Sequence, residues 1–109
     1  MIILIKNAEV YAPENMGVKD VLIVNDKIAA IDNNIFMGAD TYLKVTEIDA
    51  RGKKLVPGFI DSHVHIIGGG GEGGFATRTP EATLSGLTSA GVTTVVGCLG
   101  TDGVARDLV

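Results

Sequence analysis

The chain of 109 residues is poor in cysteine and in positive charge. Cys98 is its only cysteine, and nine Lys and Arg residues stand against 13 Asp and Glu, for a formal charge of −4. A lone cysteine excludes an internal disulfide and is typical of a reducing compartment, so we expect a cytoplasmic protein. No basic stripe is visible, and the apolar residues 1–5 are too few for a membrane span. We therefore expect neither nucleic acid nor a membrane as partner.

The sequence is rich in apolar residues and glycine, and its pattern changes near Pro57. Hydrophobic residues make up 46% of the chain, which favours a folded protein over disorder. The first part, residues 1–56, contains short β signals separated by polar loops. They span residues 2–6, 21–24, 28–31 and 44–49, and a hairpin turn through residues 25–27 is expected between the second and the third. These signals predict a small domain with an antiparallel β-sheet.

The second part, residues 57–109, has the pattern of a βαβ unit. We expect strands at 59–66 and 93–99, with a helix between them. Thr79 is the expected N-cap, Pro80 the first helical residue and Gly91 the glycine that ends the helix. Strands joined in this way are parallel and carry ligand-binding residues at their carboxyl ends. The predicted fold class is thus α/β.

Two histidines, His63 and His65, lie one residue apart on the first of these strands. Side chains alternate along a strand, so both imidazoles and Asp61 are expected on one face. Neutral imidazole is a common ligand of divalent transition metals, and two supply half of a zinc coordination shell. The alternative is a pair of ordinary polar residues. Asp61 has two possible roles. It accepts a hydrogen bond from a metal-bound histidine, or it is a structural acid.

After the histidines comes a loop, residues 68–74, with six glycines and one acid, Glu72. Glycine lets the backbone approach a ligand closely, although a flexible linker has a similar composition. The acid and the preceding histidines favour the wall of a site. For Thr101 the residues alone indicate a turn position, and for Cys98 a small buried hydrophobe.

Four segments carry a resemblance to a known family. They read PGFIDSHVH (57–65), HIIGGGGEGG (65–74), TRTPE (77–81) and VGCLGTD (96–102). In these segments the chain resembles the isoaspartyl (β-aspartyl) dipeptidases of the amidohydrolase superfamily of metal-dependent hydrolases. The resemblance implies that the first domain is part of a composite β-sandwich and that the second begins a TIM barrel.

The resemblance also implies a site. It implies two zinc ions bridged by a carbamylated lysine and a hydroxide, with His63 and His65 matching metal ligands of the first strand. Glu72 matches a residue that binds the α-amino group of a small dipeptide substrate, and Gly70, Gly71 and Thr101 match other substrate contacts. Apart from the resemblance, the apolar strand at 93–99 is expected to leave an unpaired edge, so we also expect a homo-oligomer.

A complete barrel needs about 250 residues, so 57–109 can hold only its first two strands and the start of a second helix at 104–109. The bridging lysine, further histidines and the general-base aspartate of the family are absent, and no catalytic residue is predicted in this segment. We expect an N-terminal part of an enzyme that is inactive alone. Two alternatives stay open: a cyclic amidase of the dihydroorotase or hydantoinase kind, disfavoured because Ile67 stands where such enzymes offer an arginine, and a non-catalytic module that self-associates.

Overall fold

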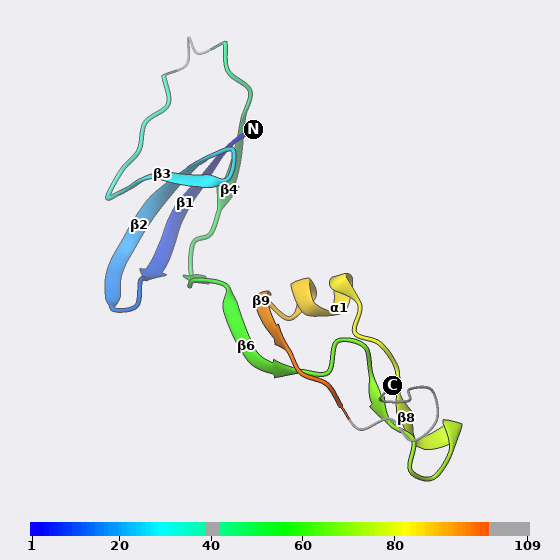
Figure 1. Cartoon of the computed structure of the whole chain (residues 1–109). Helices are drawn as coiled ribbons and strands as arrows, with labels where there is room; N and C mark the ends of the chain where they lie inside the picture. The colour runs from blue at the N-terminus through cyan, green and yellow to red at the C-terminus, as the bar shows by residue number, and fades with distance from the viewer. Residues whose placement is uncertain (39–41, 101–109) are drawn as a thin grey trace. The chain divides into compact units, whose positions relative to one another are not determined.

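The computed structural model describes residues 1–38 and 42–100 and divides the chain into two compact units, Met1–Pro57 and Gly58–Val109 (Figure 1). The first unit is a single five-stranded sheet in the order β3-β2-β1-β4, with β5 also pairing with β1. Its strands are β1 (Ile2–Tyr11), β2 (Asn15–Val24), β3 (Lys27–Asp32), β4 (Val45–Asp49) and β5 (Lys54–Leu55). The predicted strands are all present, and β1 and β2 extend well beyond the predicted bounds.

The sheet of the first unit is mixed rather than purely antiparallel. Strands β1, β2 and β3 are antiparallel neighbours, and the predicted turn between β2 and β3 is confirmed, with Asn25 in the left-handed region at φ 56°. Strands β4 and β5 instead run parallel to β1. The prediction rested on tight hairpin turns, whereas the long connection between Asp32 and Val45 allows the chain to return in the parallel direction.

The core of the first unit lies around β1. Its buried apolar side chains come from β1, β2 and the residue after β4: Leu4, Ala8, Val10, Val21 and Ala50. Asp20 is buried beside them and forms an ion pair of 2.7 Å with Lys6. Its carboxylate also accepts hydrogen bonds from the backbone N–H groups of Asn7 and Ile35, both at 2.9 Å. Burial would raise the pKa of Asp20, but the hydrogen bonds from Lys6, Ile35 and Asn7 outweigh it and lower that pKa.

The second unit contains the predicted βαβ arrangement. Strands β6 (Phe59–Val64) and β9 (Val92–Gly97) are parallel and form a two-stranded sheet, with helix α1 (Leu84–Ser89) between them in sequence. A second pair of very short strands, β7 (Gly69–Gly70) and β8 (Arg78–Thr79), is antiparallel, and a 3-10 turn, η1 (Phe75–Thr77), connects them. The glycine segment therefore forms a small hairpin of its own.

Helix α1 begins later than the sequence predicted. Its N-cap is Thr83, whose hydroxyl accepts a hydrogen bond of 3.1 Å from the backbone N–H of Gly86. Thr79 instead belongs to β8, because a residue before proline favours extended backbone. The predicted end is confirmed, since Gly91 follows the helix with φ 78° and donates its N–H to Thr88. In the described part of the chain no helix has the length and apolar character needed to cross a bilayer.

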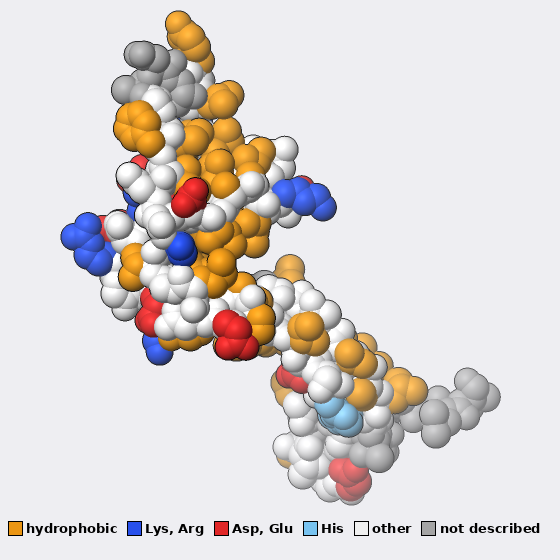
Figure 2. Space-filling view, turned by 90° about the vertical axis from the view of Figure 1, so that its left-hand side faces the viewer, with side chains coloured by type: hydrophobic (Ala, Val, Ile, Leu, Met, Phe, Trp, Pro, Cys, Tyr) orange, Lys and Arg blue, Asp and Glu red, His pale blue; other side chains and the backbone are white. Residues whose placement is uncertain are grey.

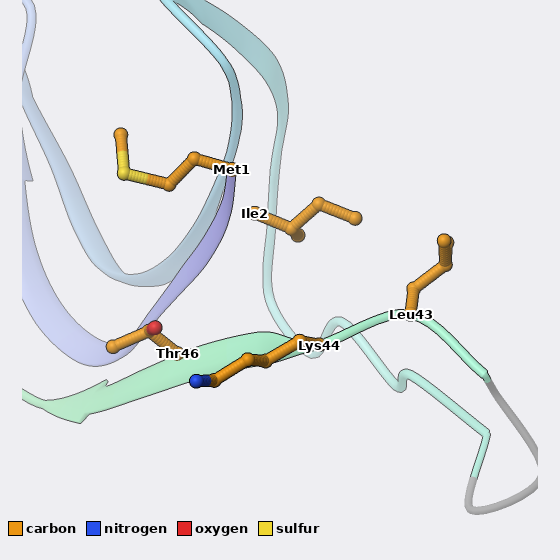
Figure 3. A pocket seen from close by; sticks show the side chains of 5 residues that line it. All are labelled: Met1, Ile2, Leu43, Lys44 and Thr46. Carbon is orange, nitrogen blue, oxygen red and sulfur yellow. The ribbon is translucent and has the colours of Figure 1, made fainter.

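A hollow in the first unit lies where β1 and β4 begin (Figure 3). Its lining residues are Met1, Ile2, Leu43, Lys44 and Thr46. The side chains of this lining contain one ammonium group and one hydroxyl but no imidazole, thiol or carboxylate. We therefore assign it no catalytic or metal-binding chemistry.

Candidate metal and substrate site

The two histidines at the end of β6 lie together on one side of the strand. The ring centroids of His63 and His65 are 5.0 Å apart, and the rings meet edge to face at 88°. Both side chains are exposed, and Figure 2 shows histidine at the surface in pale blue. This arrangement confirms that strand alternation brings the imidazoles side by side. Their role as metal ligands stays a prediction.

The ring of His65 is held from the neighbouring strand. Its Nδ1 lies 3.2 Å from the backbone carbonyl oxygen of Cys98, which follows the last residue of β9. Cys98 itself is half-buried, and its thiol donates to the carbonyl of Val96 at 3.8 Å. Sequence reasoning missed this contact because a backbone carbonyl is the same in every residue type. Only the parallel pairing of β6 with β9 identifies it.

Asp61 supports the backbone of the histidine segment. Its Oδ1 accepts a hydrogen bond of 3.1 Å from the backbone N–H of His63. The sequence allowed two roles for Asp61, and this contact corresponds to that of a structural acid.

The glycine loop is anchored at several points. The N–H of Gly68 donates to the carbonyl of His65 at 2.9 Å, and β7 pairs with β8 along the loop. Gly68, Gly70 and Gly71 have positive φ values of 75°, 84° and 88°, a region that side chains with a Cβ rarely adopt. Gly68, Gly69 and Gly71 are buried. A loop whose backbone is hydrogen-bonded and whose glycines are buried is suited to line a binding site. This favours the site wall over the flexible linker.

The predicted substrate residues Gly70, Gly71 and Glu72 are consecutive at the turn of this loop. A Cβ at Gly70 would lie 3.7 Å from Oε2 of Glu72, so the carboxylate lies over the Cα of that glycine. Glu72 is exposed. Thr101, the fourth predicted substrate residue, lies outside the described residues, as does the predicted second helix at 104–109.

The ends of β6 and β9 and the start of the glycine loop meet at Gly100. A Cβ on Gly100 would lie 3.2 Å from Nδ1 of His65, 3.3 Å from the carbonyl oxygen of Gly68 and 3.4 Å from Cα of Gly69. Two segments that are separate in sequence, residues 65–69 and Gly100, thus lie close together at the carboxyl ends of the two parallel strands. Such strand ends are where α/β proteins carry their ligands.

The donor set fits part of a metal site. Two adjacent imidazoles offer nitrogen ligands of the type that zinc prefers. Among residues 1–38 and 42–100, no group of three or more His, Cys, Asp or Glu side chains is arranged to hold a metal ion. The described residues therefore offer only the two imidazoles as candidate ligands, and any further ligands would have to come from elsewhere.

Fold and site together define an α/β protein with a candidate ligand site at the carboxyl ends of parallel strands. The family model of the amidohydrolase family matches residues 46–101, just over half of the sequence. The chain therefore belongs to the amidohydrolase family, whose members are generally metal-dependent.

Solved structures and curated relatives extend this result. The crystal structure of β-aspartyl dipeptidase from Fervidobacterium islandicum AW-1 in complex with the β-Asp-Leu dipeptide is 50% identical, with a TM-score of 0.80 over 99% of this chain and 28% of that chain. A dihydroorotase of Elusimicrobium minutum is 44% identical over 90 residues, 79% of this chain and 20% of the relative. A 5-methylthioadenosine/S-adenosylhomocysteine deaminase of Thermococcus onnurineus is 46% identical over 67 residues, 60% of this chain and 15% of the relative. The chain spans less than a third of each of these proteins.

Proposed function

We propose that the chain is the N-terminal part of a zinc-dependent hydrolase that cleaves the isopeptide bond of β-aspartyl dipeptides. The observation that carries the proposal is the 50% identity, over 99% of this chain, to a β-aspartyl dipeptidase crystallised with β-Asp-Leu. The histidine pair and the anchored Gly70-Gly71-Glu72 turn supply chemistry that suits such a substrate. Bound zinc would lower the pKa of the water that attacks the isopeptide carbonyl.

The residues of this chain would bind and orient. His63 and His65 would hold metal through ring nitrogens. The carboxylate of Glu72 suits the α-ammonium group of the dipeptide, because an ionised acceptor and a cationic donor form a strong hydrogen bond. Successive N–H groups at Gly70 and Gly71, with φ above zero, suit a carboxylate, and the hydroxyl of Thr101 is proposed to join them.

Zinc binding and hydrolysis of β-Asp-Leu, measured separately, test the proposal. The 109-residue chain should bind zinc through its histidines but show no turnover, since two ligands cannot hold a metal pair at the spacing of ~3.5–4 Å that activates a shared hydroxide. A polypeptide that contains this sequence and a complete barrel should hydrolyse the dipeptide. His63→Ala and His65→Ala should abolish that activity.

Ser62 provides a matched control, because strand alternation places it on the opposite face of β6 from the histidines. Ser62→Ala should retain zinc binding and activity. Turnover by the 109-residue chain itself, lost in His63→Ala, would refute its inactivity and indicate a site assembled across chains. Full activity of both histidine variants in the complete enzyme would overturn the metal role.

Hydrolysis of a cyclic amide is a second candidate, and the similarity to a dihydroorotase over 90 residues favours it. The two candidates differ in the substrate's charge, because a dipeptide offers an α-ammonium group to Glu72 and a dihydroorotate ring does not. Parallel assays with β-Asp-Leu and dihydroorotate decide between them. A higher kcat/KM for dihydroorotate would replace the proposal with the cyclic amidase.

Association between copies of the chain is a further proposal. Among the described residues β9 pairs only with β6, and near its end the side chains of Val96 and Leu99 are 51% and 76% exposed. An unpaired strand edge beside apolar surface favours pairing with another chain. Light scattering over a dilution series should show association that Val96→Lys weakens. A wild-type monomer at high micromolar concentration would contradict it. No nucleic-acid or membrane partner is proposed.

A further inference from the structure

The segment TRTPE (77–81) has no role in the proposed function, although it lies against the glycine loop. Strand β8 pairs Arg78 with Gly70, and the backbone carbonyl oxygen of Thr77 would be 3.2 Å from a Cβ at Gly70. The side chain of Thr77 contacts the loop again beyond Glu72. Thr77 therefore touches the loop on both sides of that acid.

The hydroxyl of Thr77 closes the turn that carries Glu72. The N–H of Gly74 donates to the carbonyl of Gly71 at 2.9 Å across this turn. Oγ1 of Thr77 accepts a hydrogen bond of 3.0 Å from the N–H of Gly73 and donates one of 3.0 Å to the carbonyl of Gly74. A hydroxyl has one proton and two lone pairs, so it can make both contacts at once. A valine side chain could make neither.

The close contact with Thr77 explains the glycine at position 73. The φ of Gly73 lies outside the left-handed region, so its backbone conformation does not itself require glycine. An added Cβ, however, would be 2.9 Å from Cγ2 and 3.2 Å from Oγ1 of Thr77, closer than carbon atoms normally approach. Only glycine lets the hydroxyl reach the loop backbone here.

We propose that Thr77 is a positioning residue that holds the Glu72 turn in the shape that recognises the α-ammonium group of the substrate. This inference rests on the proposed function, in which Glu72 accepts that group. Other contacts hold the base of the loop, since Arg78 donates to the carbonyl of Ile67 at 3.4 Å and pairs with Glu81 at 2.9 Å. Removal of the Thr77 hydroxyl should therefore loosen the tip of the loop and leave its base in place.

Two substrates that differ only in the α-amino group test the inference in an enzyme with the complete barrel. They are β-Asp-Leu and succinyl-Leu, the same molecule without that group. Thr77→Val should raise KM for β-Asp-Leu with little change in kcat, because the weakened contact is remote from the reacting bond. The ratio of kcat/KM for β-Asp-Leu to that for succinyl-Leu should fall by about 3- to 10-fold.

Three further variants distinguish positioning from a general effect on the fold. Thr77→Ser keeps the hydroxyl and should keep the wild-type ratio. Glu72→Gln should lower the ratio, and the addition of Thr77→Val to it should cause no further fall, because Thr77 acts through Glu72. Thr88→Val removes a hydroxyl that donates to the carbonyl of Leu84 within α1, and it should leave the ratio unchanged.

Gly73→Ala disturbs the same contact from the loop side and keeps the hydroxyl. The new Cβ would press on Cγ2 of Thr77, so the ratio should fall as it does in Thr77→Val. Thr77→Ser removes that methyl group, and the double variant should recover much of the ratio. This pair keeps the inference testable if Thr77→Val does not fold.

Amide hydrogen exchange of the 109-residue chain tests the turn without a substrate. The N–H of Gly73 should exchange about 3-fold or more faster in Thr77→Val than in the wild type. The N–H of Ala82 donates to the carbonyl of Ile66 at 2.8 Å, at the base of the loop, and its exchange should not change. Equal exchange of Gly73 in both proteins would overturn the positioning role.

The outcomes separate this inference from the proposed function. A ratio that falls in Glu72→Gln but not in a folded Thr77→Val enzyme overturns the inference and leaves the proposed function in place. Equal losses of kcat/KM for both substrates in Thr77→Val also overturn it, because they show a general effect on the site. A wild-type enzyme that does not hydrolyse β-Asp-Leu overturns the proposed function and the specificity that rests on it, whereas faster exchange of Gly73 in Thr77→Val would still support the hold of Thr77 on the turn.

Discussion

The two units of the chain differ in what they bury. Among the described residues of Met1–Pro57, the buried ones carry side chains, five of them apolar and one the paired acid Asp20. In the described part of Gly58–Val109 the buried residues are Gly68, Gly69 and Gly71. The first unit is thus stabilised by a side-chain core, whereas the second packs loop backbone closely and presents its reactive side chains outward.

The strands of the second unit also expose large apolar side chains. Phe59 and Ile60 of β6 are 60% and 70% exposed, and Leu84 of α1 is 77% exposed. Parallel strands are usually covered on both faces, and burial of apolar surface is the main source of stability. We therefore expect the second unit to open at lower free energy than the first.

The sequence provides a separate reporter for each unit. The chain has no tryptophan, both tyrosines, Tyr11 and Tyr42, are in the first unit, and both histidines are in the second. Tyrosine fluorescence and histidine NMR signals in a denaturant series therefore follow the two units independently.

The largest effect is expected from Asp20→Ala. The substitution leaves the ammonium of Lys6 without its carboxylate and removes the acceptor of two backbone N–H groups, those of Asn7 and Ile35. Removal of one partner from a buried pair costs about 3–5 kcal/mol. The free energy of unfolding followed by tyrosine fluorescence should fall by about that amount. Glu47→Ala, at an exposed acid on β4, should change it by no more than about 0.5 kcal/mol. If Asp20→Ala lowered the free energy of unfolding as little as Glu47→Ala does, this would contradict the side-chain core as the source of stability.

Gly68→Ala tests the close packing of backbone in the second unit. Gly68 has φ 75°, and an added Cβ would collide with the carbonyl oxygen of Thr79. Left-handed strain of about 1–2 kcal/mol and overpacking of about 1–3 kcal/mol predict a loss of about 2–5 kcal/mol in the histidine-monitored transition. Gly74 has φ 93°, but a Cβ there would meet no atom within 4 Å. Gly74→Ala should therefore lower the free energy of unfolding through strain alone, by about 1–2 kcal/mol. Equal losses at both positions would show that packing contributes nothing.

Glu72→Gln tests the functional side of the comparison in an enzyme that contains the complete barrel. A charged hydrogen bond to the substrate ammonium is worth about 1.5–3 kcal/mol and a neutral one about 0.5–1.5 kcal/mol. The loss of kcat/KM for β-Asp-Leu should therefore be larger in Glu72→Gln than in Thr101→Val. Similar losses of kcat/KM in both variants would mean that Glu72 does not bind the ammonium group.

Much of the fold could be read from local patterns. The strand periods, the turn at Asn25 and the glycine after α1 depend on neighbouring residues, and the structure confirms them. The parallel pairing of β4 with β1 depends on how the chain returns after a long connection, which no local pattern encodes. The predicted start of α1 at Thr79 is wrong. Thr79-Pro80 also suits the end of a strand, and the pairing of β8 with the glycine segment places Thr79 in that strand.

The candidate site divides in the same way. The shared side of His63 and His65 follows from strand alternation, so the sequence predicted it. His65 contacts the backbone carbonyl of Cys98 and lies beside the space that the missing side chain of Gly100 leaves. Neither feature is marked in the sequence by a particular residue type. The lining of a site by backbone is therefore the part that only the three-dimensional structure reveals.

The smallest effect expected is the acid dependence of the Asp20 contribution. The pKa of Asp20 is lowered in the folded chain, although burial acts to raise it, because hydrogen bonds from Lys6 and from two N–H groups prevail. A group with a lowered folded pKa contributes stability above its unfolded value of ~3.9, and this stability is lost as the pH falls through the folded value.

The gap in unfolding free energy between wild type and Asp20→Asn should therefore be constant from pH 7 to about pH 5 and narrow below about pH 4. Hydrogen bonds from Asn7 and Tyr11 also lower the pKa values of Asp49 and Glu9, respectively. Both acids are present in the two proteins, so their titration cancels in the difference. Denaturant titrations at each pH, followed by tyrosine fluorescence, measure the gap. If the gap widened on acidification, Asp20 would bind its proton more readily in the folded chain, and its hydrogen bonds would not outweigh its burial.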